Sequence, residues 1–266
     1  MTLAALGPEG TISHEVALRC AEGGAVVLLP TIGQIFSFVA EGKGDGIVPI
    51  ENSESGGIGA TLDGLRRHAC WITGQITVPV RHQYAVSRPE AKPALLYVHP
   101  ETHEQCSIFI EDAGIPVVHT ASNAESARAA AGHPAGAGAI TTLSAASRWG
   151  LTVMRADVQN SPGNCTRFVR IGTAPLPVPA SGTCSIIVDP LEDRAGLLHA
   201  ILGVFAGRGI NLTRIESRPS RRRMGEYLFF IDADMHPGWQ DALADLAGMA
   251  TIRDLGCYGA IGGDSA

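Results

Sequence analysis

The chain has 266 residues, of which 45% are hydrophobic and 17% are charged. That balance excludes a disordered chain, because it provides enough apolar side chains for a core, and the length predicts one or two domains. The 20 basic and 26 acidic residues give a net charge of −6, which excludes the basic surface of a nucleic-acid-binding protein. No apolar segment has the roughly 18 residues of a membrane span, and the N-terminus lacks the pattern of a signal peptide. We therefore expect a cytoplasmic protein with no membrane partner.

In chain order, the first 172 residues alternate between short apolar strands and amphipathic helices. Strands are predicted at 3–6, 25–29, 46–50, 94–98, 116–120, 137–141 and 169–171. Helices are predicted through 16–20, 32–39 and 106–113, and after the capping box formed by Ser122 and Glu125. Such alternation predicts an α/β region with a parallel or mixed sheet, and it fits either one sheet or two lobes.

Residues 173–182 form the clearest boundary, because prolines at positions 175, 177 and 179 favour an extended linker. Beyond it, strands are predicted at 184–189, 212–218, 226–234 and 251–258, and helices at 198–205 and 239–246. The resulting order, βαββαβ, is that of a ferredoxin-like unit.

Cysteine and glycine patterns bear on metals and cofactors. The six cysteines lie far apart, at positions 20, 70, 106, 165, 184 and 257, and no two form a Cys-x-x-Cys pair. We therefore expect neither a disulfide framework nor a structural metal. His99 and His103 are four residues apart, but Pro100 places them on a strand end and a helix, which argues against a metal site. No Walker loop or G-x-G-x-x-G pattern is present, so no nucleotide cofactor is expected.

Polar residues gather in loops that follow predicted strands, where ligand-binding side chains are often found. Residues 7–13 either present N–H groups and hydroxyls to an anion or form a simple turn with a helix cap. Residues 51–63 combine carboxylates, an amide and hydroxyls, and otherwise form a solvated turn. Arg167 could grip a substrate carboxylate with two parallel hydrogen bonds, or could lie on the surface.

Taken in order, several segments resemble the motifs of the prephenate dehydratase family. They are GPEGTIS at 7–13, PIENSESGGIGATLDGL at 49–65, VPVRHQYAV at 78–86, HPETHEQC at 99–106 and NCTRF at 164–168. Further on, GINLTRIESRP at 209–219 resembles the regulatory ACT domain that this family carries. The resemblance covers nearly the whole chain, and the predicted linker falls between its two parts.

The resemblance implies an α/β catalytic domain at 1–172 with two lobes like those of type II periplasmic binding proteins, the second at 78–152. A linker at 173–182 and an ACT domain at 183–266 follow. The implied reaction converts prephenate to phenylpyruvate with loss of carbon dioxide and water, in phenylalanine biosynthesis, without a cofactor or a metal. Arogenate dehydratase and a non-catalytic amino-acid sensor are the alternatives.

By resemblance, Thr166 is the catalytic proton donor, while Asn52 and Gln105 bind or orient the substrate. Substrate binding is implied for Thr11, Ser13, Ser53, Thr61, Arg167 and Phe168. Feedback inhibition by L-phenylalanine is implied at an interface between ACT domains of a homodimer or homotetramer. The residues implied there are Ala195, Gly196, Leu197, Leu198, Asn211, Leu212, Glu216, Ser217, Arg218 and Pro219. Ala195 and Leu197 replace a proline and an alanine of the family motif, so the larger Leu197 is expected to reshape the pocket.

Overall fold

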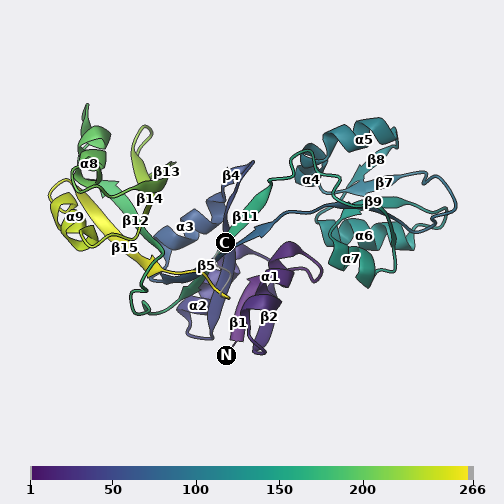
Figure 1. Ribbon diagram of the computed structural model, residues 1–266, viewed down its shortest axis with the longest axis horizontal. Coiled ribbons are helices and arrows are strands. Elements are labelled where there is room, and N and C mark those ends of the chain that lie inside the picture. The colour runs from purple at the N-terminus through teal and green to yellow at the C-terminus, as the bar shows by residue number, and fades with distance from the viewer. Residues whose placement is uncertain (1, 263–266) are drawn as a thin grey trace.

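The structure, a computed structural model, describes residues 2–262 and contains three β-sheets. The first sheet lies in the middle of the molecule, with the second sheet and the C-terminal sheet on opposite sides of it (Figure 1). The N-terminal region therefore forms two lobes rather than one sheet. None of the helices within residues 2–262 is long and apolar enough to cross a membrane.

The first lobe is a mixed sheet with three helices. Its strands, in spatial order, are β2 (Ala25–Leu29), β1 (Thr2–Leu6), β3 (Asp45–Asn52), β11 (Cys165–Gly172) and β5 (Trp71–Pro79), and β4 (Gly56–Gly57) pairs with β3. The helices are α1 (Ile12–Cys20), α2 (Ile32–Ala40) and α3 (Gly59–Arg67). Strands β1, β2 and β3 are parallel, whereas β11 runs antiparallel to β3 and β5. This pairing places the start of β11 beside the end of β3.

Helix α2 shows how local sequence builds this lobe. It begins after Thr31, whose hydroxyl accepts a hydrogen bond from the Gln34 N–H at 3.2 Å, as a helix N-cap does. Its residues Ile35 and Phe36 are fully buried. A Cβ atom on Gly64 of α3 would lie 2.2 Å from the Phe36 ring, so only glycine allows the two helices to pack this closely.

The second lobe has a smaller sheet and four helices. Its strands, in spatial order, are β10 (Thr152–Arg155), β6 (Gln83–Val86), β9 (Gly138–Thr141), β7 (Leu96–Val98) and β8 (Val117–His119). The helices are α4 (Pro100–Gln105), α5 (Ser107–Ala113), α6 (Asn123–Gly132) and α7 (Leu143–Arg148). Two segments connect the lobes, residues 80–82 between β5 and β6 and residues 156–164 between β10 and β11.

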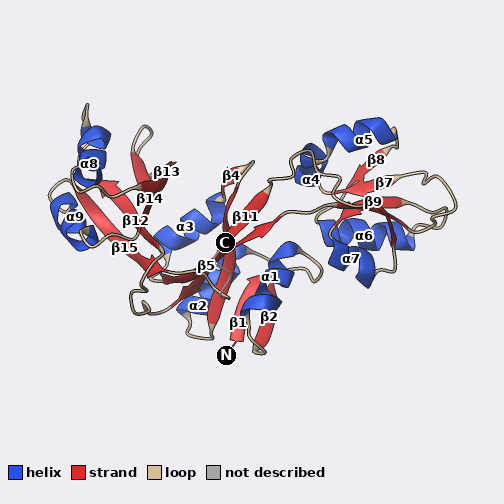
Figure 2. Ribbon diagram, in the orientation of Figure 1, coloured by secondary structure: helices blue, strands red, loops and turns tan. Residues whose placement is uncertain are grey.

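The C-terminal region is a four-stranded antiparallel sheet with two helices. The spatial order is β13 (Leu212–Pro219), β14 (Tyr227–Asp234), β12 (Thr183–Pro190) and β15 (Ala250–Tyr258), with α8 (Leu197–Ala206) and α9 (Trp239–Leu246). Both helices cover the face directed away from the first lobe (Figure 2). The other face contributes Phe230 and Tyr258 to a core shared with Leu65 of the first lobe. The C-terminal sheet is therefore packed firmly against the first lobe.

The expectation about disulfides is wrong. Cys184 of β12 and Cys257 of β15 stand directly opposite each other in the antiparallel pair and form a disulfide, although 73 residues separate them in sequence. Cysteine spacing did not reveal this pairing, because the two residues meet only through the strand register.

Candidate active site

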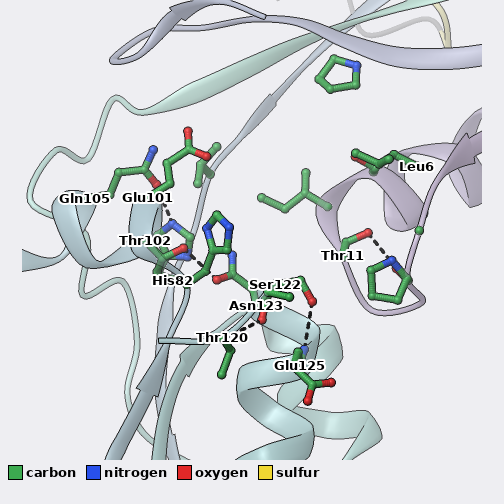
Figure 3. Close-up of a pocket in the computed structure, with 18 of the residues that line it drawn as sticks. Leu6, Thr11, His82, Glu101, Thr102, Gln105, Thr120, Ser122, Asn123 and Glu125 are labelled. Atoms are coloured by element: carbon green, nitrogen blue, oxygen red, sulfur yellow. Dashed lines mark hydrogen bonds between the residues drawn. The ribbon is translucent and has the colours of Figure 1, made fainter. Parts of the chain in front are cut away.

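A cleft of about 870 Å³ lies between the two lobes. Its polar lining consists of Thr11, Ser13, Asn52, His82, Tyr97, His99, Glu101, Thr102, Gln105, His119, Thr120, Ser122, Asn123, Glu125 and Thr166. Figure 3 shows that labelled residues of the second lobe face Thr11 and Leu6 of the first lobe across this space. No lysine or arginine is among the lining residues within 2–262. An anionic ligand in this cleft must therefore be held by hydroxyls, amides, backbone N–H groups or histidines.

Thr166 and Asn52 meet where β11 pairs with β3. The two residues are direct partners in the strand register, and both are largely buried. The Asn52 Nδ2 atom donates a hydrogen bond to Thr166 Oγ1 at 3.1 Å and another to Asn164 Oδ1 at 2.8 Å. Because this donor occupies a lone pair of Oγ1, the Thr166 hydroxyl keeps its own proton for a group in the cleft.

The orientation of the Asn52 amide is determined by its other end. The Oδ1 atom accepts hydrogen bonds from the backbone N–H groups of Glu54 at 2.9 Å and Ser55 at 3.0 Å. A backbone N–H can only donate, so the oxygen must face the loop and the nitrogen must face Thr166. Asn52 therefore orients Thr166 and is itself held by the loop that follows β3.

Gln105 reaches the cleft from the second lobe, at the end of α4. Its Oε1 atom lies 2.9 Å from Nε2 of His82. A dashed line in Figure 3 marks this hydrogen bond. His82 comes from the connection between the lobes and is 1% exposed. Burial lowers the pKa of His82, against the opposing effects of its hydrogen bond with Gln105 and the charge of Glu101. The imidazole is therefore neutral near pH 7.

Two helix N-termini border the cleft. Thr11 caps α1 by accepting a hydrogen bond from the His14 N–H at 3.3 Å, and Ser122 caps α6 by accepting one from the Glu125 N–H at 3.1 Å. Asn123 at the start of α6 is held by Thr102, whose hydroxyl donates to Asn123 Oδ1 at 2.7 Å. First-turn N–H groups have no partner within a helix and carry partial positive charge, so both ends favour an anion.

Three residues expected to bind substrate lie outside the cleft, and these placements are corrections. Thr61 is fully buried, and its hydroxyl donates to the Pro49 carbonyl oxygen at 2.5 Å. Ser53 Oγ accepts a hydrogen bond from the Cys165 N–H at 3.0 Å and does not line the cleft. Arg167 points to the opposite face of the sheet, because successive side chains of a strand alternate and its neighbour Thr166 faces the cleft. Thr11, Ser13, Asn52, Gln105, Thr166 and Phe168 do line the cleft.

Arg167 instead joins the first lobe to the C-terminal sheet. Its guanidinium contacts Asp232 of β14 at 2.5 Å and Glu51 of β3 at 2.9 Å. Burial by itself would lower the pKa of Arg167, but Asp232, Tyr258 and Glu51 together outweigh that effect and raise the pKa. Arg214 of β13 lies 3.5 Å from the same Glu51 carboxylate. A charged cluster thus connects the strand that carries Thr166 with the C-terminal sheet.

The residues expected to bind phenylalanine fall into two separate groups in this chain. Gly196, Leu197 and Leu198 line a cavity of about 740 Å³ beside the start of α8. The edge strand β13 carries five others, and none of these five lines that cavity: Leu212, Glu216, Ser217, Arg218 and Pro219. Glu216 of β13 approaches β4 and Arg218 approaches the start of α3, where Cβ atoms on Gly57 and Gly59 would collide with them. This side of β13 therefore faces the catalytic lobe.

Two site residues had no role assigned from the sequence. Asn164 is 1% exposed and accepts the hydrogen bond from Asn52, and His82 contacts Gln105. Both stand inside motifs used for the family resemblance, the first residue of NCTRF and the histidine of VPVRHQYAV. Motif membership was the available signal, but their contacts depend on strand pairing and on the connection between the lobes.

Two α/β lobes around a cleft that holds a positioned hydroxyl and amides, joined to a βαββαβ unit, define a ligand-binding α/β protein with an attached ferredoxin-like domain. Residues 3–175 match the family model described as prephenate dehydratase, and residues 186–248 match the ACT domain model. The chain therefore belongs to the prephenate dehydratase family, whose members are carbon–oxygen lyases of phenylalanine biosynthesis, and it carries the ACT regulatory domain.

Relatives cover almost the entire chain. The bifunctional chorismate mutase/prephenate dehydratase of Pseudomonas aeruginosa is 34% identical over 97% of this chain and 73% of its own length. The prephenate dehydratase of Bacillus subtilis is 30% identical over 97% of this chain and 95% of its own length. Among solved structures, the prephenate dehydratase of Arthrobacter aurescens in complex with L-Phe is 31% identical, with a TM-score of 0.87, and the match covers 100% of this chain and 92% of that one.

Proposed function

We propose that the cleft binds prephenate and that Thr166 donates the proton that turns the departing hydroxide into water. In this reaction the bond from the ring to its carboxylate breaks and releases carbon dioxide. The electron pair of that bond makes the ring aromatic while the ring carbon–oxygen bond breaks. The observation that carries the proposal is the 3.1 Å hydrogen bond from Asn52 to Thr166 Oγ1. It stabilises the negative charge that develops on Oγ1 as the proton leaves, until solvent restores the proton.

The cleft suits prephenate, a dianion whose ring carboxylate is lost as carbon dioxide. Among the described residues, no lysine or arginine lines the cleft, and its donors include Ser13, Gln105 and the first turns of α1 and α6. A salt bridge to the ring carboxylate would stabilise the bound substrate more than the transition state, in which that charge disappears, and would slow decarboxylation. Neutral donors avoid this penalty while still orienting the substrate.

We further propose feedback inhibition by L-phenylalanine through the ACT domain at 183–266, joined by the linker at 173–182 to a catalytic domain at 1–172; residues 1 and 263–266 of these ranges lie outside the described residues. The L-Phe complex of the Arthrobacter relative supports the ligand. The cavity beside Leu197 would supply one part of the site, and β13 of a second subunit the other, in a dimer or tetramer. Arg167 supports coupling between the ACT domain and the cleft, because it contacts Asp232 of the ACT domain while Phe168, the next residue along β11, lines the cleft.

The purified chain assayed with prephenate, and in parallel with arogenate, tests this function. We expect phenylpyruvate from prephenate, inhibition on addition of L-phenylalanine, and slower turnover of arogenate. Calorimetry with L-phenylalanine measures its binding independently of catalysis. Binding of L-phenylalanine without turnover of either substrate would instead indicate an amino-acid sensor.

A further inference from the structure

His82 is a buried polar residue that the mechanism above leaves without a role. It is 1% exposed, lines the cleft and contacts Gln105, which approaches from α4 of the second lobe. Its Nδ1 atom is buried and has no hydrogen-bond partner among the described residues. A buried histidine whose single side-chain hydrogen bond goes to a cleft residue is placed to act through that residue.

The backbone of His82 is fixed on both sides within the connection between the lobes. Its N–H donates to Gln159 Oε1 at 3.0 Å, and its carbonyl oxygen accepts from the Val158 N–H at 2.9 Å. Both partners belong to the second connecting segment, residues 156–164. The imidazole therefore projects from a pair of chain segments that are bonded to each other. The second segment is also bonded to the end of α4, because the Asn160 N–H donates to the Gln105 carbonyl oxygen at 2.7 Å, so the backbones of His82 and Gln105 are held in one network.

The hydrogen bond also determines which end of the Gln105 amide faces the cleft. With Oε1 directed at His82, the neutral imidazole must carry its proton on Nε2, and the amide nitrogen turns away from the ring. No other described residue bonds to Gln105 Nε2, so its two N–H groups are free to meet a ligand. The opposite orientation of the amide would present an acceptor to an anionic substrate.

We propose that His82 is a positioning residue that holds the Gln105 amide with its N–H donors toward the substrate. The inference rests on the proposed role of Gln105 in the cleft. His82 itself neither donates to nor accepts from the substrate in this arrangement.

A double-mutant cycle tests the proposal. We expect His82→Leu to lower kcat/KM by about 10- to 100-fold, the effect of one buried hydrogen bond lost. His82→Gln, which again offers an N–H donor, should retain activity within about threefold. The variant His82→Leu/Gln105→Leu should be no slower than Gln105→Leu alone, because His82 acts only through Gln105. Far-UV circular dichroism and L-phenylalanine binding check that each variant is folded.

The outcomes separate the two proposals. If Gln105→Leu matches the wild type, the proposed role of Gln105 fails and this inference fails with it. If Gln105→Leu is impaired and the losses of the two single variants multiply in the double variant, Gln105 keeps its role and the inference about His82 is overturned. Nitrogen NMR of histidine-labelled wild-type protein provides a test that needs no variant to fold. We expect His82 to be protonated on Nε2, and a proton on Nδ1 alone would overturn the proposal.

Discussion

At the scale of single residues, the site depends on which atom of each amide faces the cleft. Asn52 offers its nitrogen to Thr166 because its oxygen is held by two backbone N–H groups. Asn52→Asp would replace that nitrogen with a carboxylate oxygen, which opposes charge development on Thr166. We expect kcat to fall by about 100-fold.

The pH dependence of Asn52→Asp makes this prediction specific. Protonation converts the introduced carboxylate to a neutral group that can donate to Thr166 again. Its kcat should therefore rise as the pH falls through the pKa of the introduced carboxyl, relative to wild type at each pH. A variant with wild-type kcat, or with a loss that is the same at every pH, would contradict this role of Asn52.

His82 gives a prediction about stability. Burial lowers the pKa of folded His82, whereas the unfolded residue titrates near about 6.5. As the pH falls, His82 is therefore protonated in the unfolded state before it is protonated in the folded state. The contribution of neutral His82 to the free energy of unfolding is complete above about pH 6.5 and is lost as the pH falls toward the folded pKa. Urea unfolding from about pH 7 to about pH 5 should show a steeper loss of unfolding free energy for wild type than for His82→Gln. Parallel curves would contradict the prediction.

The sequence motifs selected Thr166, Asn52 and Gln105, which line the cleft, and also Arg167, which does not. The difference has a simple cause, because a motif does not say which way each side chain points. Residues 169–171 were predicted as a strand without extending it back to Cys165. Had the strand been extended, alternation would have placed Thr166 and Arg167 on opposite faces.

At the scale of elements, predictions succeeded where hydrophobic periodicity was strong. Strand β2 has the predicted bounds, α8 is longer than predicted by one residue at each end, and β13 is longer by one residue. Strand β5 was missed, because glycine and polar residues interrupt its apolar pattern. Its Gly74 is required by a tertiary contact, since a Cβ atom there would lie 2.6 Å from the Ile261 side chain. Local sequence could not reveal that contact.

The contact between β11 and β14 should be important for stability. Asp232 is buried against Arg167, so Asp232→Asn leaves an arginine that is only 16% exposed without its main counter-charge. We expect the free energy of unfolding to fall by about 3 kcal/mol. Asp63→Asn is a matched control, because it removes an ion pair with the half-exposed Arg221 between the same two parts of the chain. Its cost should be less than about 1 kcal/mol in the same denaturation experiment, and equal losses would contradict the account.

At the scale of the whole molecule, the same contact provides a route from the ACT domain to the cleft. Asp232 lies outside the cleft, so Asp232→Asn should change catalysis mainly through regulation. We expect L-phenylalanine to bind with nearly unchanged affinity but to inhibit less at saturation. Calorimetry and inhibition curves measured on the same preparation separate these two quantities. Full inhibition in a folded variant would show that the signal takes another route.

The disulfide is a second feature of the whole molecule that sequence spacing concealed. Cys184 and Cys257 are bonded, while the other four cysteines are free. We expect a thiol reagent to label four cysteines in the unfolded, unreduced protein and six after reduction. Reduction should lower the unfolding free energy by about 2–4 kcal/mol, as for disulfides that close long loops. Labelling of six cysteines before reduction would contradict the bond.

In the proposed reaction, the Thr166 hydroxyl supplies the proton for loss of hydroxide. The most direct measurement compares the rate of phenylpyruvate formation from saturating prephenate by wild type, Thr166→Val and Thr166→Ser. Valine keeps the shape of the side chain but has no proton to donate, so kcat should fall by about 10²–10⁴-fold. Serine keeps the hydroxyl and should retain much of the activity. A valine variant within a few-fold of wild type would show that Thr166 is not the proton donor.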